Sequence, residues 1–269
     1  MINEISNFFK KKQIYLNNKF FPHIVLDDFL ENEIAEKVNN EIENIADDSD
    51  PYFNFNVKKF AINDREKLKA NTVNLIDFLN SEKFIKQLEN LTGLKGLIPD
   101  PRLEGGGIHY VKSGGYLRVH SDFQSHIINS NWSRTLNLLL YFNKDWKSDY
   151  NGSIELWSAD MNEKITYEPI FNRALLFYTG KNSYHGHPKK LTTPTNIFRK
   201  SIALYYYIDK KKHLKLSETN FVPLPKDDTF TKFLMKLDQL LLRVFSFLKR
   251  KQIVNDKTYT KIIKKITKK

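Results

Sequence analysis

The sequence predicts a mainly β fold with flanking helices, of the α+β class. From about residue 97 the apolar residues alternate as in a strand, whereas before that point they recur at helical spacing. The β-rich runs that follow are short and separated by turn residues, which is typical of a sandwich or barrel. Hydrophobic residues make up 41% of the 269 residues, enough to fill the core of one large domain.

The region before residue 97 is expected to form a short strand and two helices. The segment FFPHIVLDDFL (20–30) predicts the strand, and Asp27 or Asp28 is expected to cap the first helix. The apolar stripe of this helix would consist of Ile34, Val38, Ile42 and Ile45. A second helical region is expected at 66–93, because apolar residues keep helical spacing until Gly93. Both helices would precede the sheet.

Six β-rich runs make up the expected sheet. They are residues 107–111, 116–120, 134–142, 153–157, 174–178 and 198–208. Turn residues such as Asn151-Gly152 separate them. A further amphipathic helix is expected in TFTKFLMKLDQLLLRVFSFLKRK (229–251), and a lysine-rich end follows it.

Charge and composition narrow the possible classes of protein. The net charge of +12 belongs mostly to the tail, since residues 243–269 hold ten Lys or Arg and one acid. We therefore expect no specific nucleic-acid partner, and only a weak contact of this tail with an anionic surface. The chain has no cysteine, so a metal would have to bind His, Asp or Glu. No apolar run has the length of a membrane span and the first residues do not resemble a signal peptide, so a cytoplasmic location is expected.

The run GGYLRVHSDF (114–123) places an imidazole and a carboxylate on one face of an extended chain. His120 and Asp122 are two positions apart, so they project together and can chelate one cation. His185 follows a strand-like run and a short turn, and it would supply a third ligand. Two His and one carboxylate on one face of an octahedron leave three positions open, which is the geometry of non-haem iron(II) sites.

Two further residues bear on this site. His187 competes with His185 for the third ligand position, because the two share a face in an extended chain. The position of His185 directly after the preceding strand and turn favours it. Arg199 begins the last strong strand, and its planar guanidinium could bind the far end of a dicarboxylate through two hydrogen bonds.

Consecutive blocks of the sequence resemble the iron(II)- and 2-oxoglutarate-dependent oxygenases, in particular their prolyl 4-hydroxylase-like branch. The blocks are HYVKSGGYLRVHSD, RTLNLLLYFNKDW, GSIELW, EPIFNRALLFYTG, SYHGHP and FRKSIALYYYID, in unbroken order over about residues 98–209. The resemblance implies a double-stranded β-helix (jelly-roll) core with N-terminal helices packed on it and a C-terminal helix. It divides the chain into a single oxygenase domain at 1–227, with a helical part at about 27–93 and the core at about 97–209, and a C-terminal helix and basic tail at 228–269.

The resemblance also implies the roles of single residues. The iron ligands would be His120, Asp122 and His185. Arg199 would pair with the C5 carboxylate of 2-oxoglutarate. Tyr141 and Tyr110 match tyrosines that hydrogen-bond this cosubstrate, and the alternative for each is a core aromatic whose hydroxyl is satisfied elsewhere.

The implied activity is that of a 2-oxoglutarate-dependent dioxygenase. With iron(II), 2-oxoglutarate and O2 it would hydroxylate an unactivated C–H bond and release succinate and CO2, with ascorbate as a candidate reductant. The substrate, a small molecule or a peptide, stays open between peptidyl proline, free amino acid, sugar, lipid and nucleobase. Two alternatives are a non-catalytic jelly-roll binding module and an adaptor that uses its basic tail on nucleic acid or an anionic membrane.

The sequence departs from the family pattern beside the expected site. The segment 123–133 is longer than in the oxygen-sensing members and borders the place where substrate would lie. The segment 186–198 is also longer, so the position of Arg199 depends on the return of this excursion to register. Four neighbouring residues have open roles. Arg118 would share the face of His120 and is a candidate contact for an anionic substrate, and His109 would face away from the iron. Arg134 is either a substrate contact or a surface ion-pair partner, and His126 is a candidate substrate contact.

Overall fold

The computed structural model describes residues 1–2, 8–215 and 217–254. The first strands are β1 (His23–Leu26), β2 (Asp50–Phe53), β3 (Val57–Ile62), β4 (Leu97–Pro99), β5 (Gly107–Val111) and β6 (Tyr116–Ser121). The later strands are β7 (Trp132–Tyr141), β8 (Ile154–Trp157), β9 (Lys164–Tyr167), β10 (Ala174–Tyr178), β11 (Tyr184–His187), β12 (Arg199–Asp209) and β13 (Asn220–Phe221).

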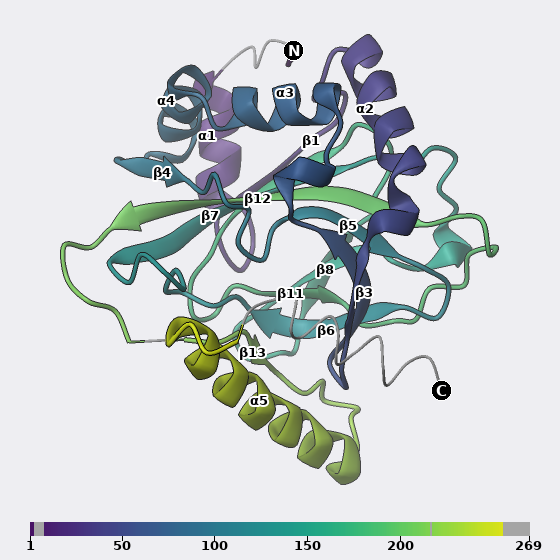
Figure 1. The fold of residues 1–269 in the computed structure, drawn as a ribbon, viewed down its shortest axis with the longest axis vertical. Coiled ribbons are helices and arrows are strands. Elements are labelled where there is room, and N and C mark those ends of the chain that lie inside the picture. The colour runs from purple at the N-terminus through teal and green to yellow at the C-terminus, as the bar shows by residue number, and fades with distance from the viewer. Residues whose placement is uncertain (3–7, 216, 255–269) are drawn as a thin grey trace.

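These strands form one curled sheet in the described part of the chain. Its order is β1-β10-β7-β12-β5-β3-β6-β11-β8-β9, with β13 beside β6, β2 beside β3 and β4 beside β12. Figure 1 shows the sheet folded over on itself, and residues from both of its halves line one central cavity. The mainly β jelly-roll with flanking helices that the sequence predicts is confirmed.

Helices lie on two sides of this sheet. They are α1 (Phe8–Asn17), α2 (Asn32–Asn44), α3 (Ala70–Leu79), α4 (Glu82–Thr92) and α5 (Thr229–Arg250). Figure 1 shows α1 to α4 together over one face of the sheet and α5 on the opposite side of the molecule. Among the described residues, no helix combines the length and the apolar character needed to cross a membrane.

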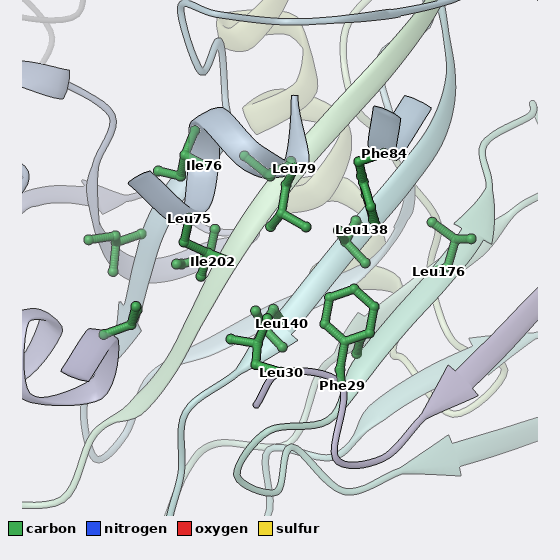
Figure 2. Close-up of a cluster of buried hydrophobic side chains, with 14 of the residues drawn as sticks. Phe29, Leu30, Leu75, Ile76, Leu79, Phe84, Leu138, Leu140, Leu176 and Ile202 are labelled. Atoms are coloured by element: carbon green, nitrogen blue, oxygen red, sulfur yellow. The ribbon is translucent and has the colours of Figure 1, made fainter. Parts of the chain in front are cut away.

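The main hydrophobic core lies between the N-terminal helices and the sheet (Figure 2). Its labelled side chains come from α3, α4, the segment after β1, and three strands: Leu75, Ile76, Leu79, Phe84, Phe29, Leu30, Leu138, Leu140, Leu176 and Ile202. Along β7 the alternation of a strand divides the side chains, because Leu138 and Leu140 enter this core whereas Asn137 and Leu139 line the cavity. The same packing that buries β7 therefore fixes which of its residues reach the site.

The six predicted strands are confirmed, and each of their ends lies within two residues of the end in the structure. The predicted C-terminal helix corresponds to α5. The predicted helical region at 66–93 is two helices, since Ser81 caps α4 by accepting a hydrogen bond from the Phe84 amide. As expected, this second helix ends at Gly93, whose φ of 78° is left-handed. The domain limits at 227 and 228 stay a prediction.

Two expectations for the N-terminal third are wrong. Neither Asp27 nor Asp28 caps α2, which begins at Asn32. The side chain of Asn172 bonds both backbone groups of Leu30, at 2.8 and 2.7 Å, and this holds the chain extended so that Leu30 enters the core. The expectation that both helical regions precede the sheet is also wrong, because the hairpin β2–β3 lies between α2 and α3. Polar residues on this hairpin hide its alternation.

The core predicts a large difference between two leucines. Leu138 is 2% exposed between the helices and the sheet, whereas Leu240 on α5 is 55% exposed. We expect Leu138→Ala to lower the free energy of unfolding by about 2–5 kcal/mol through lost burial and a residual cavity. Leu240→Ala, the matched control, should change it by less than about 0.5 kcal/mol. Urea unfolding followed by circular dichroism measures both, and equal effects would contradict this packing.

Candidate metal centre

Two histidines and an aspartate meet at one end of the cavity. His120 on β6 lies directly opposite His185 on β11, with ring centroids 4.4 Å apart. Asp122 follows β6 by one residue, and its side chain is 8% exposed. One ligand atom from each of the three lies within 4.8 Å of the others. Among the described residues this is the group that could hold a metal, and it contains His185 rather than His187.

The hydrogen bonds of both imidazoles leave their Nε2 atoms free for a cation. Nδ1 of His120 donates to the Arg118 carbonyl at 2.9 Å, and Nδ1 of His185 donates to the Ser183 carbonyl at 3.0 Å. Both Nε2 atoms lie 3.5 Å from carboxylate oxygens of Asp122. Burial lowers the pKa of His185 to about 4, although the Asp122 charge opposes this, so the ring is neutral near pH 7. Two imidazole nitrogens that face one carboxylate suit a bound metal ion.

Arg134 and Asn137 hold the carboxylate of Asp122. Its Oδ2 accepts a hydrogen bond from the Asn137 amide at 2.8 Å and forms an ion pair with the Arg134 guanidinium at 3.0 Å. Burial alone would raise the pKa of Asp122, but the charge of Arg134 together with the neighbouring His185 and His120 outweighs it and holds this pKa well below its usual range. The guanidinium also stacks on the ring of Tyr205, 3.3 Å from its centroid. The carboxylate is therefore ionised and fixed in direction.

The position of Arg134 differs from the one that the sequence predicts, and Asn137 was not predicted as a site residue. Arg134 is not on the surface: it is 2% exposed and is paired with a predicted metal ligand. Asn137 stands among leucines in the run RTLNLLLYF, and a polar side chain inside a buried strand needs a hydrogen-bonding partner. This polar residue in an otherwise apolar strand was the feature of the sequence that could have identified Asn137 as a site residue.

Arg199 lines the same cavity, and Tyr141 lies behind it. Nη2 of Arg199 donates to the Tyr141 hydroxyl at 3.4 Å, and its Nε donates to the Gly152 carbonyl at 2.7 Å. Gly152 has a φ of 77°, and a Cβ there would lie 3.1 Å from Cδ of Arg199, so glycine suits this turn. The long segment 186–198 thus returns to register, and Arg199 pairs with Val111 on β5. Arg199 lines the cavity, with Tyr141 behind it.

Tyr110, predicted as the second cosubstrate tyrosine, does not reach the cavity. Its hydroxyl donates to the Ile42 carbonyl of α2 at 2.7 Å, and its ring belongs to the main core. His109 lines the cavity instead, so the expectation that His109 faces away is also wrong. The two alternate along β5 as expected, so once Tyr110 packs in the core His109 must point to the other face, where the cavity lies.

Two other residues with open roles lie outside the site. Arg118 pairs with Asp227 at 3.4 Å and lines a different pocket, so it does not share the cavity with His120. His126 is fully buried, accepts from the Asn129 amide at 2.9 Å and lies 3.6 Å from Asp100. It stabilises the segment 123–133 rather than facing a substrate.

The cavity has a volume of about 260 Å³ and an excess of positive charge. Lys59, Arg134 and Arg199 line it, whereas Asp122 is the only acid among its described lining residues. Nζ of Lys59 donates to Nε2 of His109 at 3.3 Å. Burial lowers the pKa of Lys59 to about 8; the Asp122 charge opposes this, and the two arginines add to it. Lys59 was not predicted to line the site, because it lies on β3, a strand that the sequence did not predict.

His187 lies on the same strand as His185 but has a different environment. It is 4% exposed, lines the cavity, and its Nδ1 has no hydrogen-bonding partner among the described residues. Burial and the neighbouring charges of Arg199 and Lys59 hold the pKa of His187 well below its usual value. A neutral imidazole beside two cations, with one open nitrogen, completes a region of the cavity that suits an anionic ligand.

The fold is similar to those of several solved oxygenases. A prolyl hydroxylase from Trichoplax adhaerens, in complex with a peptide fragment of the hypoxia-inducible factor oxygen degradation domain, is 18% identical with a TM-score of 0.52; the match covers 78% of this chain and 95% of that one. A Pseudomonas putida prolyl 4-hydroxylase is 12% identical with a TM-score of 0.51, covering 74% and 98%. A non-haem α-ketoglutarate-dependent carbocyclase from nogalamycin biosynthesis is 9% identical with a TM-score of 0.51, covering 83% and 90%. These likenesses concern the fold.

A family match covers the part of the sequence that contains the site. No curated protein matches the chain significantly. Residues 106–207 match the family model described as the 2OG-Fe(II) oxygenase superfamily, and this span contains the three clustered ligand candidates and Arg199. The jelly-roll fold agrees with that match. Residues 106–207 are therefore a 2OG-Fe(II) oxygenase domain, of the kind that uses iron(II), 2-oxoglutarate and O2, and the chain has a fold similar to that of prolyl 4-hydroxylases.

Proposed function

We propose that this protein is a hydroxylase that inserts one oxygen atom of O2 into an unactivated C–H bond and releases succinate and CO2. The observation that carries the proposal is the convergence of His120, Asp122 and His185 on one point in a cavity that also contains Arg199. Two imidazoles and one carboxylate would hold iron(II) from one side and leave positions for 2-oxoglutarate and O2. The bound iron and cosubstrate supply the oxidising chemistry.

The protein side chains bind, orient and exclude water. Arg199, supported by Tyr141, would receive the distal carboxylate of 2-oxoglutarate, and Lys59 would add a second positive charge. Arg134 and Asn137 fix the direction of the Asp122 carboxylate. Apolar side chains such as Leu139 and Ile154 line the remaining wall and keep water from the reacting atoms.

The substrate would reach the cavity beside α5. Leu242 and Phe245 of this helix line the cavity, together with Phe221 of β13. These apolar side chains suit the hydrocarbon part of a substrate, either a small molecule or a peptide side chain. The peptide bound by the Trichoplax prolyl hydroxylase favours the second kind by analogy of fold alone.

The reaction class is tested with a mass-spectrometric screen. Purified protein, iron(II), 2-oxoglutarate and O2 are incubated with metabolite and peptide mixtures, and products are scored for a gain of one oxygen. We expect a product only when all three components are present, with succinate formed in step. If the protein binds iron and 2-oxoglutarate but forms no succinate under any condition, a non-catalytic binding module explains it better.

The ligand set predicts which histidine variants lose the metal. We expect His120→Ala, Asp122→Ala and His185→Ala each to weaken Mn(II) binding at least about 100-fold, because each removes a direct ligand. Calorimetric titration under anaerobic conditions measures this. His213→Ala is the control, since His213 is exposed, and His187→Ala should retain the metal. Loss of metal in His187→Ala with retention in His185→Ala would reverse the assignment.

Lys59 predicts a pH dependence of cosubstrate binding. A lysine with a pKa of about 8 is charged below this pH and neutral above it, so its attraction for a dianion is present at pH 7 and lost as the pH rises to 9. We expect the Kd of 2-oxoglutarate for the Mn(II) protein to rise about tenfold over this interval, the value of one charge-assisted hydrogen bond. Calorimetry measures this Kd.

The variants for this prediction are adjacent lysines. Lys59→Met should bind 2-oxoglutarate weakly at both pH values, with little remaining pH dependence. Lys58→Met is the matched control, because Lys58 is exposed on the other side of the same strand. An unchanged Kd in Lys59→Met would show that this lysine does not contact the cosubstrate.

A further inference from the structure

The outer face of α5 is apolar and exposed. Its side chains Phe230, Phe233, Leu237, Leu240, Leu241, Val244 and Phe247 are between 45% and 68% exposed. They recur every three or four residues, so they form one continuous stripe, called here the outer stripe. Single exposed apolar residues are ordinary, but a contiguous patch of this kind marks an interaction site.

The orientation of α5 is fixed by its inner face. Met235 is 2% exposed, and Asp238 accepts a hydrogen bond from the Asn56 amide at 2.5 Å. Gln239 donates to the Phe221 carbonyl at 2.6 Å, and Lys249 pairs with Glu104 near the end of the helix. These contacts direct the outer stripe away from the sheet, and Figure 1 shows α5 at the margin of the molecule, away from α1 to α4.

Basic residues border the outer stripe. At 100° per residue, Lys232, Lys236 and Arg243 fall on the flank next to Phe247 and Leu240, and all three are exposed. No salt bridge of Lys232 or Lys236 is found within the described part of the chain. The only acid of the helix, Asp238, faces inward. Residues 228–269 as a whole hold twelve Lys or Arg and three Asp.

We propose that α5 docks on an anionic lipid surface, with the outer stripe in the boundary between head groups and acyl chains. A stripe of Phe and Leu with lysine and arginine on its flank is the pattern of a helix that lies in the plane of a bilayer. The basic residues complement negatively charged head groups. A second copy of the chain fits less well, because pairing two identical stripes would bring their like-charged borders together.

Docking would also orient the catalytic cavity. Leu242 and Phe245 line the cavity from α5, whereas the outer stripe occupies the other side of the same helix. The lipid surface would therefore lie one helix diameter from the cavity lining. This proposal does not depend on the reaction, because the stripe contains no residue of the metal centre.

Vesicle binding by the full-length protein tests the proposal. Sedimentation is measured with vesicles of phosphatidylcholine alone and of phosphatidylcholine with one part in four phosphatidylserine, at low and high salt. We expect binding to the anionic vesicles that weakens as salt rises, because ions screen the basic flank. Leu237→Glu/Leu241→Glu should weaken it at least about tenfold by placing charges in the apolar contact. Lys232→Gln/Lys236→Gln should weaken it several-fold.

The controls separate folding from docking. Leu16→Glu changes an exposed leucine of α1, on the opposite side of the molecule, and should bind vesicles as the unchanged protein does. Mn(II) and 2-oxoglutarate affinities should be unaltered in the α5 variants, since none of the changed residues lines the cavity. If the glutamate variant fails to fold, the lysine variant and the salt dependence still decide.

Four results would overturn the proposal. The first is absence of binding to either vesicle. The second is equal binding by Leu237→Glu/Leu241→Glu, which would assign the contact to charge alone. The third is a dimer in light scattering that this variant makes monomeric without any vesicle binding, which would show that a second copy covers the stripe. The fourth is binding of duplex DNA that the lysine variant loses and the glutamate variant keeps, in the absence of vesicle binding.

Discussion

The pairing of β6 with β11 is the contact on which the metal centre depends. His120 lies opposite His185 only in this register, and a slip of one residue would turn one of the two imidazoles out of the cavity. Gly186 allows the close approach, because a Cβ there would lie 2.8 Å from the Arg118 carbonyl oxygen and 2.9 Å from that of Leu117. The register shifts between His185 and His187, which separates the environments of these two histidines. A few backbone contacts therefore select the third ligand.

Electrostatics supply the second constraint. Arg134 offsets the cost of burying the Asp122 carboxylate, so the opposite charges of these two residues neutralise each other without any ligand. Arg199 and Lys59 have only neutral partners, Tyr141 and His109, at the distances found. Together with Arg134, these two cations outnumber Asp122, the one acid among the described lining residues, so the excess positive charge would attract the dianion 2-oxoglutarate. Binding of this dianion would relieve the repulsion between the cations.

The sequence predicted the parts of the site that follow local rules. Alternation in the run YLRVHSD placed His120 and Asp122 together, and the order of the blocks placed His185 and Arg199 near them. Predictions failed where a residue depends on contacts from a distant segment. Tyr110 was assigned from the resemblance alone and His109 was placed by its alternation with Tyr110, so both predictions failed together when Tyr110 packed against α2. Lys59 was missed because its strand has little apolar alternation.

The most direct measurement is a crystal structure of the protein grown without oxygen in the presence of iron(II) and 2-oxoglutarate. The account predicts one iron bound by Nε2 of His120, Nε2 of His185 and the carboxylate of Asp122, with the distal carboxylate of 2-oxoglutarate on Arg199. An iron bound through His187 in place of His185, or a cosubstrate whose carboxylates avoid Arg199, would contradict it.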